Sequence, residues 1–538
     1  MPWFEKLRFE SVIKDIVSDA RRGQDIFVDP FRFEDLGRKD VRDELIAEIK
    51  TRISSTYPVS DLIKIDVPKS NYVLRPGARP TLIDLISYEA VTDYIGSFIY
   101  KKIPALSFSF KRFKEKYEGK VKYASSVNHW IEFENLGRIY SENPKFKFML
   151  VTDITSFFEH ISIEVLDDRL KRFSTDQNFI HAVNFLTQTL LNNWTATNKI
   201  PRFGLPQGPD ASRALADIYL YSLDREMQKK KVTYFRFMDD IRIFSKNKNE
   251  IKINIGTLVL ALRDLKLNLN AKKTIIYETQ NKESLGKVFD PEAIRLQFLS
   301  EAFRSNKSDV LQIVKPPLFE LKNMFYDPKD AFNERHLKFF IFRTVDLMKW
   351  KLLTEKEIHD LVSEFLNLFD EQHHLANILC WFLVAAGCYS ESQKIRIQEN
   401  LIKFICDKKK NIYKWQEMWA LDAIRQLGPI TKTNLLKIKK TYSNKHELCY
   451  SQFCLIASQS NDSDEREEIL EAKRIQSDEY RATLGAVYSL NPDVLKRAGL
   501  RVPEYFRIFC SRVKPDYFGY KYILPKPSSV EEPDPSPY

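Results

Sequence analysis

The pattern of apolar and polar residues changes three times along the chain. Up to about residue 130, amphipathic helical stretches alternate with basic, proline-containing loops. Short apolar runs typical of strands then alternate with helix-like stretches, which predicts a sheet covered by helices. Helical periodicity predominates from about residue 300. The pattern predicts four parts: residues 1–130, 131–290, 291–524 and a disordered, Pro- and Ser-rich tail, 525–538.

Several elements can be placed from local signals. Residues 146–152 and 234–238 are predicted strands, and residues 211–229 are a predicted helix. The segment PKSNYVLRPGARP, residues 68–80, contains too many prolines for a helix and must be extended or turning.

The C-terminal region gives signals for both ends of helices. Thr354 and Glu357 form the capping box of one helix, and Gly428–Pro429 ends another. A series of such helices predicts a bundle or an α-solenoid.

Charge and cysteine usage narrow the class of protein. The formal net charge of +11 favours a polyanionic partner such as nucleic acid, although a simply basic protein would show the same excess. The six cysteines lack zinc-ligand spacing and indicate a reducing compartment. No apolar run is long enough to cross a bilayer, so we expect a cytoplasmic protein with no membrane contact.

Three carboxylates are the strongest candidates for chemistry. Apolar residues surround Asp239–Asp240 in the segment YFRFMDDIRIFS, which predicts a β-hairpin with both acids at its turn. Adjacent carboxylates repel each other unless a cation lies between them. Asp153 follows another predicted strand and would supply the third acid of a two-metal site. Taken alone, each acid is equally explained by an ordinary turn or strand end.

The loop FGLPQGP, residues 203–209, separates these acids in the sequence. Gly204, Gly208 and Pro209 predict a tight, exposed loop before a helix, with Gln207 projecting into the site. A plain strand-to-helix turn would have the same residues.

The order of four motifs favours a catalytic site over ordinary turns and strand ends. DITSFF, GLPQGP, FMDD and LNLNAKKT follow one another, and this order resembles motifs A to D of the reverse-transcriptase palm. Upstream, the segment from Lys69 to Pro76, followed by Pro80, Thr81 and Asp84, resembles the fingers motif of group II intron and retron-like enzymes.

The resemblance implies a role for each matching residue. Asp153, Asp239, Asp240 and the backbone carbonyl of Ile154 would hold two Mg²⁺ ions, with Mn²⁺ as a substitute. Phe158 would exclude a ribose 2′-OH and select dNTPs. Gln207 and Gly208 would line the nucleotide pocket, while Lys69 and Arg75 would contact the triphosphate. Lys273 would act on the pyrophosphate, although an ordinary surface lysine is as good an explanation.

A palm followed by a long helical region resembles the bacterial abortive-infection (Abi) reverse transcriptases of phage defence. That family implies an α+β right-hand polymerase, with fingers in residues 1–130 and palm in 131–290, followed by an all-α, HEAT-like domain. It further implies a cytoplasmic bacterial homo-oligomer that makes single-stranded DNA without a template. The DNA starts from a protein hydroxyl and stays covalently attached. Nothing local identifies the priming residue, and Tyr57, Tyr72 and Tyr538 have structural explanations too.

Two other functions remain open from the sequence. One is a conventional RNA-templated reverse transcriptase whose helical region serves as thumb or RNA-binding platform. The other is a nucleic-acid-binding scaffold with an inactive palm, which the complete set of acids disfavours.

Overall fold

The computed structural model describes residues 2–21, 26–28, 36, 39–70, 72–99, 102, 107–108, 126–196, 198, 201–286, 288–289, 293–304, 308–324, 334–441 and 446–458. Its contacts divide the chain into two compact units. We call the first the sheet unit; it comprises Met1–Asp15, Leu45–Leu62 and Ala78–Ala293. The helical unit comprises Ile16–Glu44, Ile63–Gly77 and the chain from Ile294 onward. Residues 1–130, predicted as one part, are thus shared between both units.

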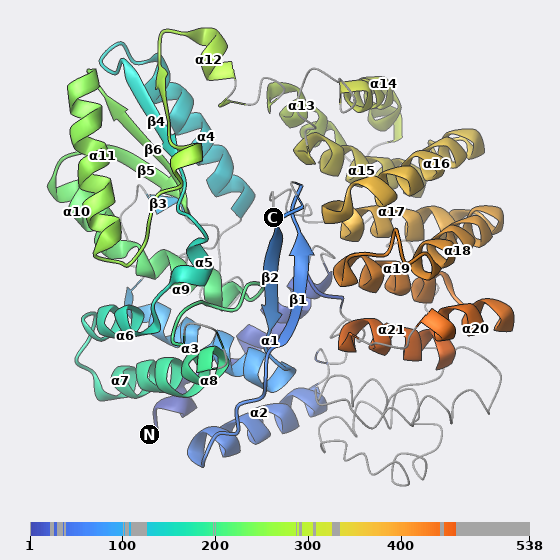
Figure 1. Ribbon diagram of the computed structural model, residues 1–538, viewed down its shortest axis with the longest axis horizontal. Helices are drawn as coiled ribbons and strands as arrows, with labels where there is room; N and C mark the ends of the chain where they lie inside the picture. Colours follow the sequence, from blue (N-terminus) through green and yellow to red (C-terminus); the bar gives the residue numbers. More distant parts are fainter. Residues whose placement is uncertain are drawn as a thin grey trace. The chain divides into compact units, whose positions relative to one another are not determined.

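The sheet unit is built on five strands in the order β3-β5-β6-β4-β7 (Figure 1). Only the pairing of β3 with β5 is parallel among these strands. The predicted strands at 146–152 and 234–238 are confirmed as β4 and β5. The strands are β3 (Ser107–Phe108), β4 (Phe148–Thr152), β5 (Thr233–Phe237), β6 (Asp240–Ser245) and β7 (Ile275–Glu278).

Helices cover both faces of this sheet. Successive side chains of a strand point to opposite faces, so neighbouring residues of β5 contact different helices. Phe235 and Phe237 pack against Phe133 of α4 (Ser126–Glu142). Tyr234 and Arg236, on the other face, bond to α10 (Tyr221–Lys229). The sheet is therefore a buried platform for its loops.

The stretch predicted as one helix over 211–229 is helical, but it consists of two helices rather than one continuous helix. The chain bends at Leu220, between α9 (Asp210–Tyr219) and α10. The remaining helices described before residue 293 are η1 (Trp3–Lys6), α1 (Phe9–Arg21), α2 (Lys39–Ser54), α3 (Leu82–Ile99), α5 (Phe157–His160), α6 (Ile163–Lys171), α7 (Gln177–Asn184), the π-helical η4 (Phe185–Leu191), α8 (Asn192–Ala196), α11 (Lys248–Arg263), η5 (Ala271–Lys273) and α12 (Lys282–Gly286).

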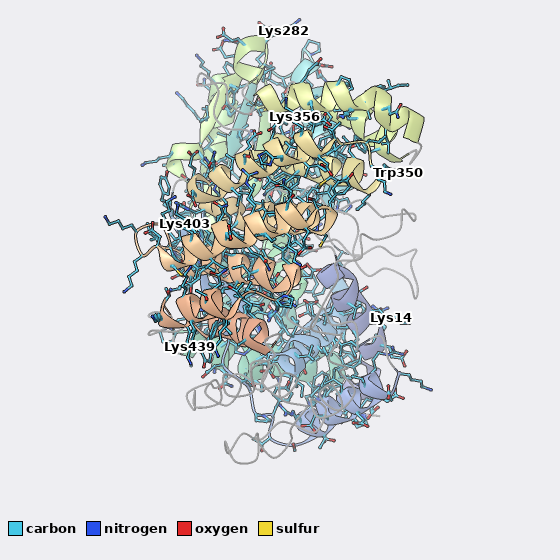
Figure 2. The ribbon with its side chains drawn as sticks, turned by 90° about the vertical axis from the view of Figure 1, so that its right-hand side faces the viewer. Lys14, Lys282, Trp350, Lys356, Lys403 and Lys439 are labelled. Atoms are coloured by element: carbon cyan, nitrogen blue, oxygen red, sulfur yellow. The ribbon has the colours of Figure 1, made fainter. Side chains whose placement is uncertain are left out.

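Helices with one large apolar core make up the described part of the helical unit after Ile294 (Figures 1 and 2). The predicted capping box of Thr354 and Glu357 is confirmed, as is the helix end at Gly428, whose φ is 101°. These helices are α13 (Ala293–Arg304), α14 (Ser308–Met324), α15 (Glu334–Lys349), α16 (Glu355–Glu371), η6 (His373–Leu375), α17 (Ala376–Tyr389), α18 (Glu391–Cys406), α19 (Lys414–Leu427), α20 (Lys432–Thr441) and α21 (Glu447–Ser458).

A β-hairpin from early in the sequence also belongs to the helical unit. Strand β1 (Ile63–Pro68) and most of β2 (Leu74–Arg79) form it, which confirms the predicted extended and turning segment. His446 Nε2 donates to the Lys64 carbonyl oxygen at 2.9 Å, and β1 contacts α19. The helices therefore hold this hairpin. None of the described helices combines the length and apolar character that a membrane crossing needs.

Candidate active site

Strand pairing brings the three acids to one end of the sheet. Thr152 of β4 pairs with Ile241 of β6, so Asp153 follows its strand where β6 begins with Asp240. Phe237 pairs with Asp240 to close the hairpin, and Asp239 lies in its turn. The predicted hairpin is confirmed. The structure thus brings Asp153, Asp239 and Asp240 together.

The three acids repel one another in a partly buried site, and this repulsion shifts the pKa of Asp240. Burial, and then the charge of Asp239, raise the pKa of Asp240 from its ordinary value to about 7. Asp153 also raises this pKa, whereas Lys273 lowers it. An acid whose pKa is raised in this way is short of nearby positive charge.

Lys273 supplies part of that charge. Its Nζ lies 2.5 Å from Asp153 Oδ2, although 66% of the lysine side chain is exposed. Partial burial lowers the pKa of Lys273, but the bond to Asp153 and the charges of the three acids outweigh it, so the pKa is raised. The sequence marked Lys273 as a candidate; its contact with Asp153 is new.

The three carboxylates fit a hard divalent cation. Asp153 is 8% exposed, and its Oδ1 is buried without a hydrogen-bond partner. Carboxylate oxygens are the ligands that Mg²⁺ prefers. Across the described ranges, no three His, Cys, Asp or Glu side chains already surround a metal position, and Lys273 contacts the oxygen that a cation would share. The residues present therefore suit Mg²⁺ once Lys273 moves.

The loop of residues 204–209 is fixed beside Phe158. Leu205 N–H donates to the Phe158 carbonyl oxygen at 3.0 Å, and Ala78 N–H donates to that of Gln207 at 3.0 Å. Gly204 has a φ of 95°, which favours glycine. The prediction that this loop is exposed is wrong. Leu205 is buried and Gln207, like Gly208 and Phe158, is half-buried, because the loop is bonded on both sides.

Two residues of α3 that the sequence did not reveal hold the helix after this loop. Glu89 is 5% exposed, and its Oε1 accepts a hydrogen bond from Ala211 N–H at 2.8 Å. Tyr88 Oη lies 3.0 Å from Ser212 Oγ. A carboxylate is favourable at the N-terminus of α9 because it satisfies an unpaired N–H and the helix dipole. The available signal was the presence of three acids, Asp84, Glu89 and Asp93, in the largely apolar α3.

A buried arginine that the sequence did not mark supports the turn with the acids. Arg236 is 0% exposed and makes a two-pronged contact with Asp224, at 2.8 and 2.7 Å. Its Nη1 lies 2.8 Å from Asp217 Oδ1 and donates to the Met238 carbonyl oxygen at 3.2 Å. Met238, with a φ of 53°, immediately precedes Asp239. The signal was an arginine inside an apolar strand.

Three further residues were predicted for the site: Lys69, Arg75 and Ile154. Lys69 follows β1 and Arg75 lies in β2, both in the helical unit, whereas the acids belong to the sheet unit. Ile154 is 2% exposed and forms a bridge with Leu269.

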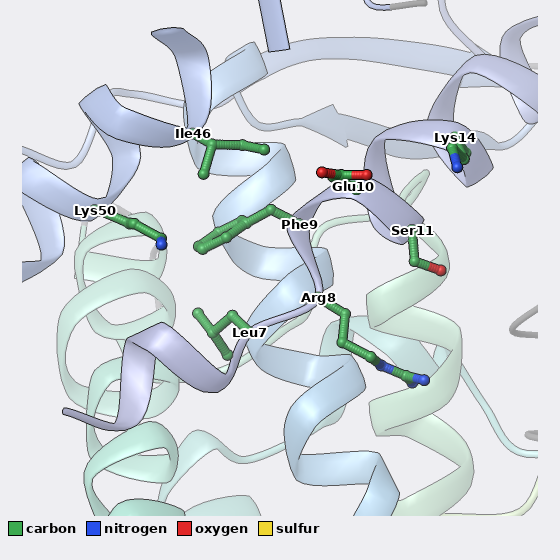
Figure 3. A pocket seen from close by; sticks show the side chains of 8 residues that line it. All are labelled: Leu7, Arg8, Phe9, Glu10, Ser11, Lys14, Ile46 and Lys50. Carbon is green, nitrogen blue, oxygen red and sulfur yellow. The ribbon is translucent and has the colours of Figure 1, made fainter. Parts of the chain in front are cut away.

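A cavity of about 410 Å³ lies at the N-terminal helices (Figure 3), and none of the three acids is among its lining residues. Arg8 at its wall pairs with Asp93 at 2.8 Å, and Lys50 pairs with Glu5 at 2.6 Å. Two of its three basic groups, those of Arg8 and Lys50, are thus already paired with carboxylates. The lining residues are Leu7, Arg8, Phe9, Glu10, Ser11, Lys14, Ile46 and Lys50.

Comparison with known proteins defines the class. Residues 78–289 match the family profile described as "Reverse transcriptase (RNA-dependent DNA polymerase)". The chain therefore contains a reverse transcriptase domain. It is a nucleotidyltransferase of the RNA-directed DNA polymerase type.

Two solved structures are similar at low scores. Apo telomerase from Candida tropicalis is 12% identical, with a TM-score of 0.33 over 80% of this chain and 73% of that chain. Telomerase from Candida albicans, in complex with the TWJ fragment of telomeric RNA, is 11% identical, with a TM-score of 0.28 over 82% and 71%. Such scores do not establish a common overall fold. Curated protein sequences give no match.

Proposed function

We propose that this chain is a DNA polymerase whose metal site consists of Asp153, Asp239 and Asp240, with the Ile154 carbonyl as a further ligand. The observation that carries the proposal is the convergence of the three acids on one end of the sheet, with a buried, unpartnered Asp153 Oδ1. Bound there, Mg²⁺ would activate the attacking hydroxyl and stabilise the leaving pyrophosphate. The hydroxyl oxygen forms a bond to the α-phosphorus as the bond to pyrophosphate breaks.

The protein side chains position the nucleotide in this proposal. Phe158 excludes a ribose 2′-OH, so the substrates are dNTPs. Gln207 and Gly208 contact the nucleotide from a loop that is fixed to Phe158 and Ala78. Lys69 and Arg75 contact the triphosphate, a task suited to basic side chains.

We further propose that synthesis is untemplated, starts from a protein hydroxyl and serves phage defence in a bacterial homo-oligomer. The support is the reverse transcriptase domain combined with the helical region that follows it. Tyr57 is a poor priming residue, because it is buried and donates to Asp84 at 2.8 Å, and burial raises its pKa well above the ordinary value. Tyr72 is 66% exposed and suits the role better. Tyr538 lies outside the described residues.

Labelling with dNTPs alone tests this proposal. Purified protein with Mg²⁺, radioactive dNTPs and no nucleic acid should yield DNA that stays with the protein after denaturation and is released by protease. The double variant Asp239→Ala/Asp240→Ala is the control and should give no label. DNA synthesis that requires an added primer–template would reject the untemplated mechanism and keep the polymerase. Full activity of the control would reject the metal site.

A second candidate is an RNA-templated reverse transcriptase, which the description of the matching family favours. It predicts that RNA copurifies and that nuclease treatment abolishes synthesis.

A further inference from the structure

The segment that carries Lys273 is bonded directly to the residue that Lys273 contacts. Asn270 N–H donates to the Asp153 carbonyl oxygen at 2.9 Å, and Lys273 N–H donates to that of Asn270 at 3.1 Å. Thr274 Oγ1 lies 2.8 Å from Thr152 Oγ1, and β7 pairs with residues 148–151 of β4. These bonds therefore hold the backbone of Lys273 close to Asp153, while its side chain can turn.

Two basic side chains, Lys273 and Arg242, lower the pKa of Asp240. Arg242 also faces Asp240, but it is bonded to Glu134 and packed over the Phe133 ring. Lys273 instead bonds an acid of the site itself. The other oxygen of this carboxylate, Asp153 Oδ1, is buried and lacks a hydrogen-bond partner, so Lys273 is the side-chain partner of the Asp153 carboxylate among the described residues.

We propose that the Lys273 ammonium is a built-in counter-cation that occupies Asp153 in the absence of metal and competes with divalent cations for this site. This inference rests on the proposed metal site. A long side chain that is 66% exposed can leave Asp153 without disturbing the core. Metal binding then releases a positive charge near the site, where the triphosphate would lie. The Lys273 ammonium therefore stabilises the metal-free site and weakens its affinity for the metal.

Direct metal binding tests the competition. Mn²⁺ affinity is measured by electron paramagnetic resonance at pH 8.5 in the absence of nucleotide. Lys273→Met should bind Mn²⁺ about tenfold more tightly than the wild type. Lys273→Arg retains the charge and should stay within about twofold of the wild type. The matched control is Lys272→Met, which removes the exposed neighbouring lysine and should leave the affinity unchanged. Equal or weaker binding by Lys273→Met would overturn the proposal.

Thermal stability gives a second reading of the same variants. In EDTA, Lys273→Met should melt below the wild type because the acids lose their counter-cation, and saturating Mn²⁺ should close this gap. A gap that persists in Mn²⁺ would mean that Lys273 acts only as a structural contact. The variant Asp153→Asn/Asp240→Asn separates the two proposals: if it binds Mn²⁺ as tightly as the wild type, the proposed metal site itself is wrong.

Discussion

Arg236 donates a hydrogen bond to the carbonyl oxygen of Met238, the residue before Asp239. The same guanidinium pairs with Asp217 of α9 and Asp224 of α10. The turn that presents the acids is thus fixed from beneath by a fully buried charge network. Burial raises the pKa of Asp224, and the neighbouring Arg236 charge opposes that rise. Arg236 therefore offsets the cost of burying the Asp224 charge.

Replacing Arg236 should separate stability from catalysis. Arg236→Met removes the cation that pairs with the buried carboxylates of Asp217 and Asp224 and should lower the free energy of unfolding by about 3–5 kcal/mol. Arg236→Lys keeps the charge but cannot reach Asp224 and Met238 together. It should fold and lower kcat at least about tenfold, with little change in KM for dNTP. Denaturant titration and extension kinetics measure both effects. Arg225→Lys on α10, where Arg225 is exposed, is the control; wild-type kcat in Arg236→Lys would contradict a positioning role.

The carboxyl of Asp84 predicts a pH-dependent stability. It is 0% exposed, and burial raises its pKa to about 6, although hydrogen bonds from Ser60 N–H and Tyr57 lower it. A pKa raised above the unfolded value means that the folded state binds the proton more tightly. Stability should therefore fall as pH rises from about 4 to 6, on the order of 2 kcal/mol. Urea titrations across this range should show the slope in the wild type and lose it in Asp84→Asn.

Phe158 should control the choice of sugar. Phe158→Ala removes the half-buried ring and should raise kcat/KM for rNTPs at least about tenfold, while dNTP incorporation changes little. Single-nucleotide extension assays measure the ratio. An unchanged ratio would mean that another side chain excludes the 2′-OH.

Glu89 should act on nucleotide binding through the loop of residues 204–209. Glu89→Leu leaves the Ala211 N–H without an acceptor, which costs about 1–3 kcal/mol, and should raise KM for dNTP more than it lowers kcat. Glu89→Gln keeps an acceptor and should restore most of the affinity. Equal KM values for the two variants would exclude this route.

Two glycines should respond oppositely to alanine. A Cβ at Gly387 of α17 would overlap Leu427 Cδ2, so Gly387→Ala should destabilise by about 1–3 kcal/mol. A Cβ at Gly256 of α11 would meet nothing within 4 Å. Gly256→Ala should therefore stabilise by up to about 1 kcal/mol through helix propensity. Thermal unfolding distinguishes these outcomes, and a shift of the same sign in both would contradict the packing argument.

Local signals in the sequence were sufficient for β4, β5 and the hairpin with the acids, but not for β3 and β7. Alternation around Asp239 and the capping box at Thr354 depend only on near neighbours, so they could be read directly. The supports of the site could not be read in this way. Glu89 contacts a residue 122 positions away, and Lys273 contacts one 120 positions away. No periodicity encodes such pairs.

The errors have the same origin. The glycines and prolines of residues 204–209 do predict a tight loop, but its burial depends on bonds from Phe158 and Ala78. The break at Leu220, between α9 and α10, likewise has no glycine or proline to mark it in the sequence. The catalytic roles of the predicted residues stay predictions.

The hairpin of β1 and β2 has a consequence for how the protein forms. The bond between His446 and Lys64 closes a loop of 382 residues, and contacts between such distant residues slow folding. During synthesis the hairpin emerges from the ribosome long before α19 and α21, so it must wait for the partners that hold it. Maturation of the enzyme therefore depends on α19 and α21, and a product that ends before them would retain the acids but lack a finished hairpin.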